Sequence, residues 1–172
     1  NTTPLAVALH RQPSPEHVRE GRLSGLPEME NPASWRKNSA GELTIRRDET
    51  DRSIEFRTRF PVGVDRWSYP EFLLQLPRES QQGLFGVAFE VKVSPAAGVR
   101  QMALMAVRSR ENERGHYVTL RVPVPGEEWQ ERFVSYLTPH LKPEKIQQLR
   151  IGVNVLSDDV TVYLRNIRFI YK

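Results

Sequence analysis

Apolar and polar residues alternate along most of this chain, which is the pattern of β-strands with one buried face. In 87–93 every second residue is apolar, and the segments 118–122 and 149–155 repeat this period. Stretches rich in Val, Ile, Phe and Tyr are separated by Gly, Pro, Asp or Asn about every ten residues, which is typical of a β-sandwich or barrel. The predicted strands are 42–47, 53–60, 71–76, 85–93, 101–109, 117–124, 129–137, 148–156 and 160–171.

Helical signals are weak by comparison. Only 142–148, which has Pro143 near its start and is rich in Glu, Lys and Gln, suits a short exposed helix of a turn or two. Strands do not alternate with helices, and the sequence contains no internal repeat, which argues against parallel α/β folds, solenoids and propellers. We therefore predict an all-β fold made of two antiparallel sheets.

The first 33 residues differ in composition from the rest of the chain. They hold several of its 13 prolines and only one short apolar run, 5–9, as is common in linkers and irregular arms. A chain of 172 residues with 38% hydrophobic side chains suffices for one core but not for two full-sized domains. We predict an N-terminal arm or linker over 1–33 and one sandwich domain over 34–172.

Composition excludes several kinds of chemistry and partner. The chain has no cysteine, which rules out disulfides, thiol catalysis and cysteine-based zinc sites. Its 25 basic and 21 acidic residues give a net charge of +4 but are mixed along the sequence, so we do not expect nucleic acid as a partner. No apolar run approaches the roughly 20 residues that cross a bilayer, so we expect no membrane partner. We expect the protein to be a monomer.

Three motifs follow one another in the C-terminal half: the turn Gly126-Glu127-Glu128-Trp129 before a strand, the segment IQQLRIG at 146–152, and YLRNI at 163–167. This order resembles the galactose-binding-like jelly rolls found among the carbohydrate-binding modules appended to glycoside hydrolases. In those modules a Gly-x-x-Trp turn precedes a strand, an I-x-x-L-x-I-G strand follows, and a Y-x-x-N-I strand closes the domain. The resemblance covers about 35–171. It implies an antiparallel two-sheet jelly-roll sandwich and a secreted or cell-envelope protein.

The resemblance also indicates where a ligand would bind. In a jelly roll the third, fifth, sixth and eighth predicted strands share one sheet, whose solvent side is concave. Sugar binding needs aromatic faces and hydrogen-bonding groups in a shallow groove. Alternation places Gln75, Tyr117, Thr119, Arg121, Arg150 and Asn154 on that solvent side. Arg108 joins them if Met105 and Val107 face the core, because the fifth strand is apolar on both faces.

Three tryptophans have different expected positions. Trp67 and Tyr69 lie at the entrance to the third strand and are expected to line one end of the groove. Trp35 and Trp129 occupy positions where the resembling modules bury an indole, so we expect both in the core. The predicted carbohydrate-binding residues are therefore Gln75, Arg108, Tyr117, Arg121, Asn154, Trp67 and Tyr69.

Catalytic and metal sites find little support. Glu55, Glu71 and Glu90 are borne on predicted strands but belong to no spaced acidic motif, and no two histidines are spaced for a shared metal. We predict no catalytic residue and no cofactor. The resembling modules carry an acidic residue just before the Asn of the last strand, where this chain has Arg165, and that puts a structural calcium ion in doubt. The acidic turn residues left as calcium ligands are Asp48, Asp51, Asp158 and Asp159.

The leading hypothesis is a non-catalytic carbohydrate-binding module that binds a poly- or oligosaccharide on the concave sheet. Such a module would belong to a larger glycan-active protein, with a flanking catalytic domain. The alternative is an accessory β-sandwich whose exposed face docks a neighbouring domain or protein partner. A jelly-roll enzyme acting on glycans is the third possibility.

Overall fold

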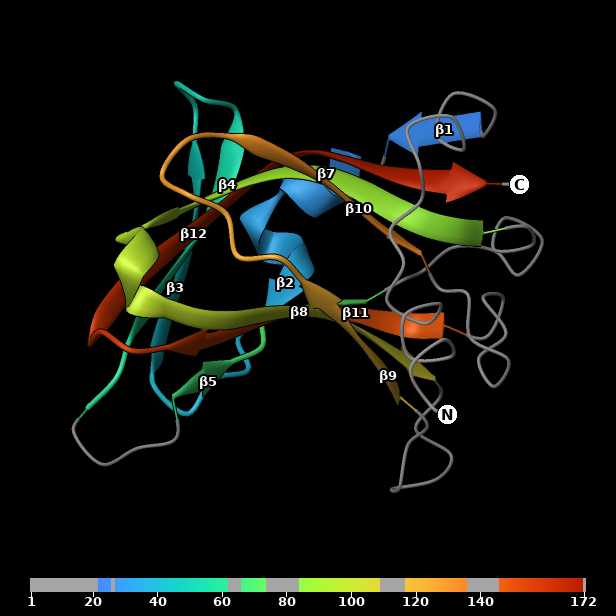
Figure 1. Cartoon of the computed structure of the whole chain (residues 1–172). Coiled ribbons are helices and arrows are strands. Elements are labelled where there is room, and N and C mark those ends of the chain that lie inside the picture. The colour runs from blue at the N-terminus through green and yellow to red at the C-terminus, as the bar shows by residue number, and fades with distance from the viewer. Residues whose placement is uncertain are drawn as a thin grey trace, which may run out of the picture.

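The computed structural model describes residues 22–25, 27–61, 66–73, 84–108, 117–135 and 146–171. These residues form two antiparallel sheets that pack face to face, as Figure 1 shows, so the predicted all-β sandwich is confirmed. Helical structure in the described residues is limited to short 3-10 turns, η1 (Pro27–Glu30), η2 (Pro32–Ser34) and η3 (Ala96–Gly98). None of these turns has the length and apolar character needed to span a membrane.

Sheet A contains the long strands β7 and β12 at its middle. Its order is β10-β7-β12-β4-β3, and β1 also pairs with β12. The strands are β1 (Arg22–Gly25), β3 (Glu42–Asp48), β4 (Ser53–Arg59), β7 (Leu84–Ser94), β10 (Gln130–Ser135) and β12 (Asp159–Tyr171).

Sheet B is built around the pair β11 and β8. Its order is β2-β6-β11-β8-β9, and β5 also pairs with β11. The third, fifth, sixth and eighth predicted strands correspond to β6, β8, β9 and β11, so they share one sheet as predicted. The strands are β2 (Trp35–Arg36), β5 (Trp67–Ser68), β6 (Glu71–Leu73), β8 (Val99–Arg108), β9 (Tyr117–Val122) and β11 (Ile146–Val155).

The core lies between the sheets and follows the alternation of the sequence. In β7 the side chains of Val87, Phe89, Val91 and Val93 are buried in it, and each contributes about 1.5–3 kcal/mol of hydrophobic stabilisation before the entropy of ordering is subtracted. Leu149, Ile151, Val153 and Val155 of β11 face them from sheet B. Trp35 is 5% exposed, packs against Phe56 and Phe72, and donates a hydrogen bond from Nε1 to the carbonyl oxygen of Met29 at 2.8 Å. The predicted burial of Trp35 is confirmed.

A β-bulge in β12 keeps its apolar side chains in the core. The register with β7 shifts between Arg165 and Arg168, and Asn166 in the bulge has a φ of 51°. Val160, Val162 and Leu164 point inward before the bulge, and Ile167 and Phe169 point inward after it. The extra residue therefore corrects a strand pattern that would otherwise turn its apolar face outward.

Two expectations differ from the structure. Residues 146–148 of the predicted helix belong to strand β11, where they pair with β8, and the rest of that segment lies outside the described residues. Trp129 is half-buried on the outer face of sheet A and is not part of the core, so its predicted burial is wrong.

Part of the predicted N-terminal arm is attached to the sandwich. Strand β1 pairs with β12, and Met29 of η1 is buried in the core. Arg47 also donates a hydrogen bond to the carbonyl oxygen of Glu30 at 3.2 Å.

Candidate functional site

The outer face of sheet B, opposite the core, carries rows of paired residues that cross its strands. In one row Arg36 pairs with Glu71, and Glu71 with Arg150. This row continues through Met105 to Thr119. The neighbouring row runs from Gly152 through Ala103 to Arg121, and the next contains Trp67, Asn154 and Gln101.

Glu71 is the centre of a polar network on this face. Its side chain is 8% exposed, and its Oε2 accepts a hydrogen bond from Arg36 at 2.9 Å. Oε1 accepts one from Asn38 at 2.9 Å and lies 2.9 Å from Nε of Arg150. The N–H of that Nε does not point at the oxygen, so this second contact is an ion pair without a hydrogen bond. Gln148 accepts a long hydrogen bond, 3.4 Å, from Nη2 of Arg150.

Trp67 and Tyr69 form an aromatic pair next to this network. Their rings are parallel, with an interplanar angle of 3° and centroids 5.4 Å apart. Both rings lie over Gly152 of β11, and Trp67 pairs in register with Asn154. The backbone N–H of Tyr69 donates to the carbonyl oxygen of Asn38 at 2.6 Å, which links the segment that carries the rings to the Glu71 network.

The middle of the face is closed, contrary to the expectation of a concave sheet face that is open to solvent. Ala103 is 6% exposed, Met105 8% and Gln148 5%. Thr119 and Arg121 on β9 are exposed, as is Arg36 on β2, whereas Trp67, Asn154 and Arg150 are half-buried. The exposed polar groups therefore lie on the edge strands β2 and β9, whereas Arg150 and Asn154 are half-buried on the central strand β11.

The structure shows which side chains of β8 face the core. Met102, Leu104 and Ala106 belong to the core, which puts Met105 on the outer side. The condition under which Arg108 was expected to face solvent is therefore not met. The sequence could not show this, because both faces of β8 are apolar.

Four predicted site residues have described side chains, and all four belong to sheet B or to the segment joining β5 and β6: Trp67, Tyr69, Arg121 and Asn154. Trp67, Tyr69 and Asn154 lie together around Gly152, and Arg121 is separated from them by β8. Gln75 lies outside the described residues, and only the backbone of Arg108 and Tyr117 is described. Sequence reasoning missed Arg36, Asn38 and Gln148; alternation along β11 signals Gln148, but only tertiary structure brings Arg36 and Asn38 to Glu71.

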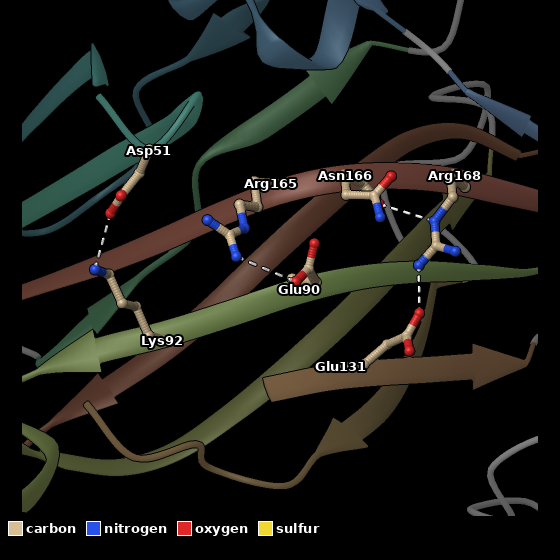
Figure 2. Close-up of polar contacts among 7 residues, drawn as sticks. All are labelled: Asp51, Glu90, Lys92, Glu131, Arg165, Asn166 and Arg168. Carbon is tan, nitrogen blue, oxygen red and sulfur yellow. Dashed lines mark hydrogen bonds and ion pairs between the residues drawn. The ribbon is translucent and has the colours of Figure 1, made fainter. Parts of the chain in front are cut away.

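The outer face of sheet A has a different character. Figure 2 shows its ion pairs: Lys92 with Asp51 at 3.0 Å, Arg165 with Glu90 at 3.4 Å and Arg168 with Glu131 at 2.6 Å. The guanidinium of Arg165 also lies 4.1 Å from the ring centroid of Trp129, and the ammonium of Lys92 lies 4.8 Å from it. Cation–π contacts hold the indole of Trp129 on this surface.

The acidic residues considered for catalysis or calcium binding have basic partners except for Asp48, whose Oδ1 accepts hydrogen bonds from the backbone N–H groups of Thr50 and Asp51. Glu55 pairs with Arg46, Glu71 with Arg36 and Arg150, and Glu90 with Arg165. Asp158 pairs with Arg66. No three carboxylate, histidine or cysteine side chains gather into a metal site within the described part of the chain.

Ion pairing lowers the pKa of two carboxyl groups, those of Asp51 and Asp159. A hydrogen bond from Lys92 holds the pKa of Asp51 below its ordinary value. A hydrogen bond from Arg57 likewise lowers the pKa of Asp159, and Asp159 in turn raises the pKa of Arg57. Both carboxyl groups are therefore kept in the ionised form, which is the opposite of what a general acid requires.

Neither a protein-family model nor a curated protein matches the sequence, but solved structures share the fold. A family 11 carbohydrate-binding module from Clostridium thermocellum, in complex with a β-1,3-1,4-mixed-linked tetrasaccharide, has a TM-score of 0.60 at 12% identity, over 88% of this chain and 96% of the module. A family 30 module of a cellulosomal cellulase of Clostridium thermocellum has a TM-score of 0.57 at 14% identity, over 81% of this chain and 92% of the module. An exo-β-agarase has a TM-score of 0.59 at 12% identity, and the match covers 84% of this chain but only 25% of the agarase chain.

At these identities the likeness concerns the fold. The chain has the antiparallel two-sheet sandwich architecture that these carbohydrate-binding modules share, the fold that the motifs at Trp129, 146–152 and 163–167 predicted.

Proposed function

We propose that this protein is a non-catalytic carbohydrate-binding module that binds a poly- or oligosaccharide on the outer face of sheet B. The observation that carries the proposal is the parallel pair Trp67 and Tyr69 above Gly152, with Asn154 beside it. Aromatic rings provide apolar faces for the C–H surfaces of sugars, and amide and guanidinium groups bind hydroxyl groups. Three arginines of the same face supply further donors: Arg36 and Arg121 on the edge strands and Arg150 on the central strand β11.

The proposal includes a larger protein context. The same fold occupies about a quarter of the length of an exo-β-agarase, which supports a role as one module of a glycan-active protein. Catalysis then belongs to a flanking domain, because the carboxylates Glu55, Glu71 and Glu90 are all held in ion pairs. The protein acts as a monomer outside the cell or in the cell envelope, where polysaccharides are found.

Affinity electrophoresis tests the proposal. The protein has a net charge of +4, so native gels are run toward the cathode, with and without a soluble polysaccharide in the gel. We expect at least one polymer of a broad neutral and acidic panel to retard the wild type, and Trp67→Ala to abolish the retardation. Trp129→Ala, which removes an indole from sheet A, serves as the control and should still be retarded. Free migration of the wild type through the whole panel would rule the proposal out.

A second function is favoured by one observation. The accessible side chains on the outer face of sheet B include Trp67 and Arg121, and aromatic residues and arginine are enriched at protein interfaces, which suits a surface that docks a neighbouring domain. In that case Trp67 and Arg121 would contact protein, and no polysaccharide would retard the chain.

A further inference from the structure

We infer that the glycan bound by this face is acidic and carries carboxylate or sulfate groups. This inference rests on the proposed function and adds the chemical class of the ligand. It follows from the distribution of charge between the two sheets.

The outer face of sheet B has an excess of positive charge. Arg36, Arg121 and Arg150 stand on it against a single carboxylate among the described residues, Glu71. That carboxylate is buried, and both of its oxygens are already in contact with Arg36, Asn38 or Arg150. Glu71 is therefore not available to repel an anionic ligand, and it fixes two guanidinium groups in place.

These guanidinium groups keep free donors. A guanidinium has five N–H donors, and the contacts with Glu71 and Gln148 use only some of them. The side chains of Arg36 and Arg150 are 44% and 27% exposed, so the remaining donors can reach a ligand. Paired N–H donors of this kind match the geometry of carboxylate and sulfate oxygens.

Arg121 supplies a second positive position. It is exposed and makes no ion pair with any other described residue. Strand β8 separates it from β11, so its backbone lies roughly 10 Å from that of Gly152, at about 4.8 Å per strand. Arg121 and Arg150 would thus contact different sugar units of one chain.

Sheet A provides the contrast. Its basic side chains are matched by acids on the same face, which leaves little net field for an anion. The pairs are Arg46 with Glu55, Arg57 with Asp159, Lys92 with Asp51, Arg165 with Glu90 and Arg168 with Glu131. Arg59 shares Asp159 with Arg57 and lies opposite Glu42 in the strand register.

The test compares acidic polymers with their neutral counterparts, using the full chain and calorimetric dissociation constants at two salt concentrations. Polygalacturonate is paired with its methyl ester, and a sulfated galactan with its desulfated form. We expect at least one acidic polymer to bind about tenfold more tightly than its neutral counterpart, with an affinity that falls as salt rises. The two arms distinguish carboxylate from sulfate recognition.

Variants locate the effect on sheet B. Arg121→Gln should weaken binding of the preferred acidic polymer about tenfold and weaken binding of its neutral counterpart much less, so that the preference for the acidic polymer is reduced. Arg52→Gln removes the same charge from the turn between β3 and β4, where Arg52 is exposed and forms no ion pair within the described residues, and should have no effect.

Each other outcome overturns a defined part of the account. Equal or tighter binding of neutral polymers overturns the acidic ligand and leaves the carbohydrate-binding module standing. Equal binding of duplex DNA shows a general affinity for polyanions and also overturns it. Absence of binding to these polymers and to the whole electrophoresis panel overturns the inference together with the proposed function.

Discussion

The ring of Tyr69 lies so close over Gly152 that a Cβ atom on this glycine would come within 3.1 Å of Cε1 of Tyr69. The same Cβ would lie 3.5 Å from Cζ3 of Trp67. Any side chain at position 152 must therefore displace the rings or be displaced by them. Because Gly152 has no side chain, the aromatic pair can pack directly against β11 on the outer face of sheet B.

Replacing this glycine should disturb the aromatic pair more than the fold. Gly152→Val places two further methyl groups where the rings lie, and we expect retardation by the bound polysaccharide to weaken about tenfold, which corresponds to 1.4 kcal/mol. Valine suits a strand, so the midpoint of urea unfolding should change little. Gly126→Val is the matched control, because a Cβ at Gly126 meets nothing within 4 Å. Undiminished binding by Gly152→Val would show that the rings do not contact the ligand.

Glu71 should matter for stability because it is the carboxylate partner shared by two arginines. We expect Glu71→Gln to lower the free energy of unfolding by about 2–4 kcal/mol, since it leaves Arg36 and Arg150 without their carboxylate on a partly buried face. Glu131→Gln removes an ion pair whose carboxylate side chain is 45% exposed and should cost less than about 1 kcal/mol. Urea unfolding monitored by tryptophan fluorescence measures both. Similar losses for the two variants would contradict the central position of Glu71.

The bulge at Asn166 should tolerate glycine but not a β-branched residue. Asn166 has a φ of 51°, a left-handed conformation that asparagine and glycine adopt readily and valine does not. We expect Asn166→Val to destabilise the protein by about 1–3 kcal/mol and Asn166→Gly to change stability by less than about 1 kcal/mol. Thermal and urea unfolding of both variants test this. Equal stability of the two would mean that the bulge relaxes without cost.

The ion pair of Lys92 with Asp51 predicts a pH dependence of stability. Because Lys92 holds the pKa of Asp51 below its ordinary value of 3.8, folding favours the ionised carboxylate. The resulting stabilisation is fully present above the unfolded pKa and is lost as the pH falls through the lower folded pKa. The difference in unfolding free energy between wild type and Asp51→Asn should therefore stay constant from pH 7 to about 5 and shrink toward pH 2.5.

Removing the partner provides the control for this effect. In a Lys92→Met background the pKa of Asp51 loses the main cause of its shift, so Asp51→Asn should no longer change the slope of stability with pH. A slope that persists in that background would assign the effect to another group.

Much of the fold could be predicted because its strands bury one face each. Val87, Phe89, Val91 and Val93 are apolar at every second position and all enter the core. The fifth predicted strand was ambiguous in phase, since Met102, Leu104 and Ala106 alternate with Ala103 and Met105, which are also apolar. Only packing against the opposite sheet decides between these two sets.

The candidate site was less predictable because its contacts join distant segments. Arg36 and Glu71 are 35 residues apart in the sequence, and no local sequence pattern predicts that they pair. Trp129 was expected in the core on the basis of family resemblance, but Arg165 and Lys92 hold its ring on the surface of sheet A. The bulge at Asn166, in contrast, could have been found from the sequence, because the inward positions Leu164 and Ile167 are one residue too far apart for a regular strand.

Chemical-shift mapping tests the central claim most directly. The ¹⁵N-labelled protein is titrated with a short oligosaccharide prepared from a polymer that retards it, and the backbone amide and tryptophan indole signals are followed. We expect the largest changes at the Trp67 indole and at the amides of Tyr69, Gly152 and Asn154, with the Trp129 indole unchanged. Changes confined to Trp129 and its neighbours on sheet A would contradict a ligand site on sheet B.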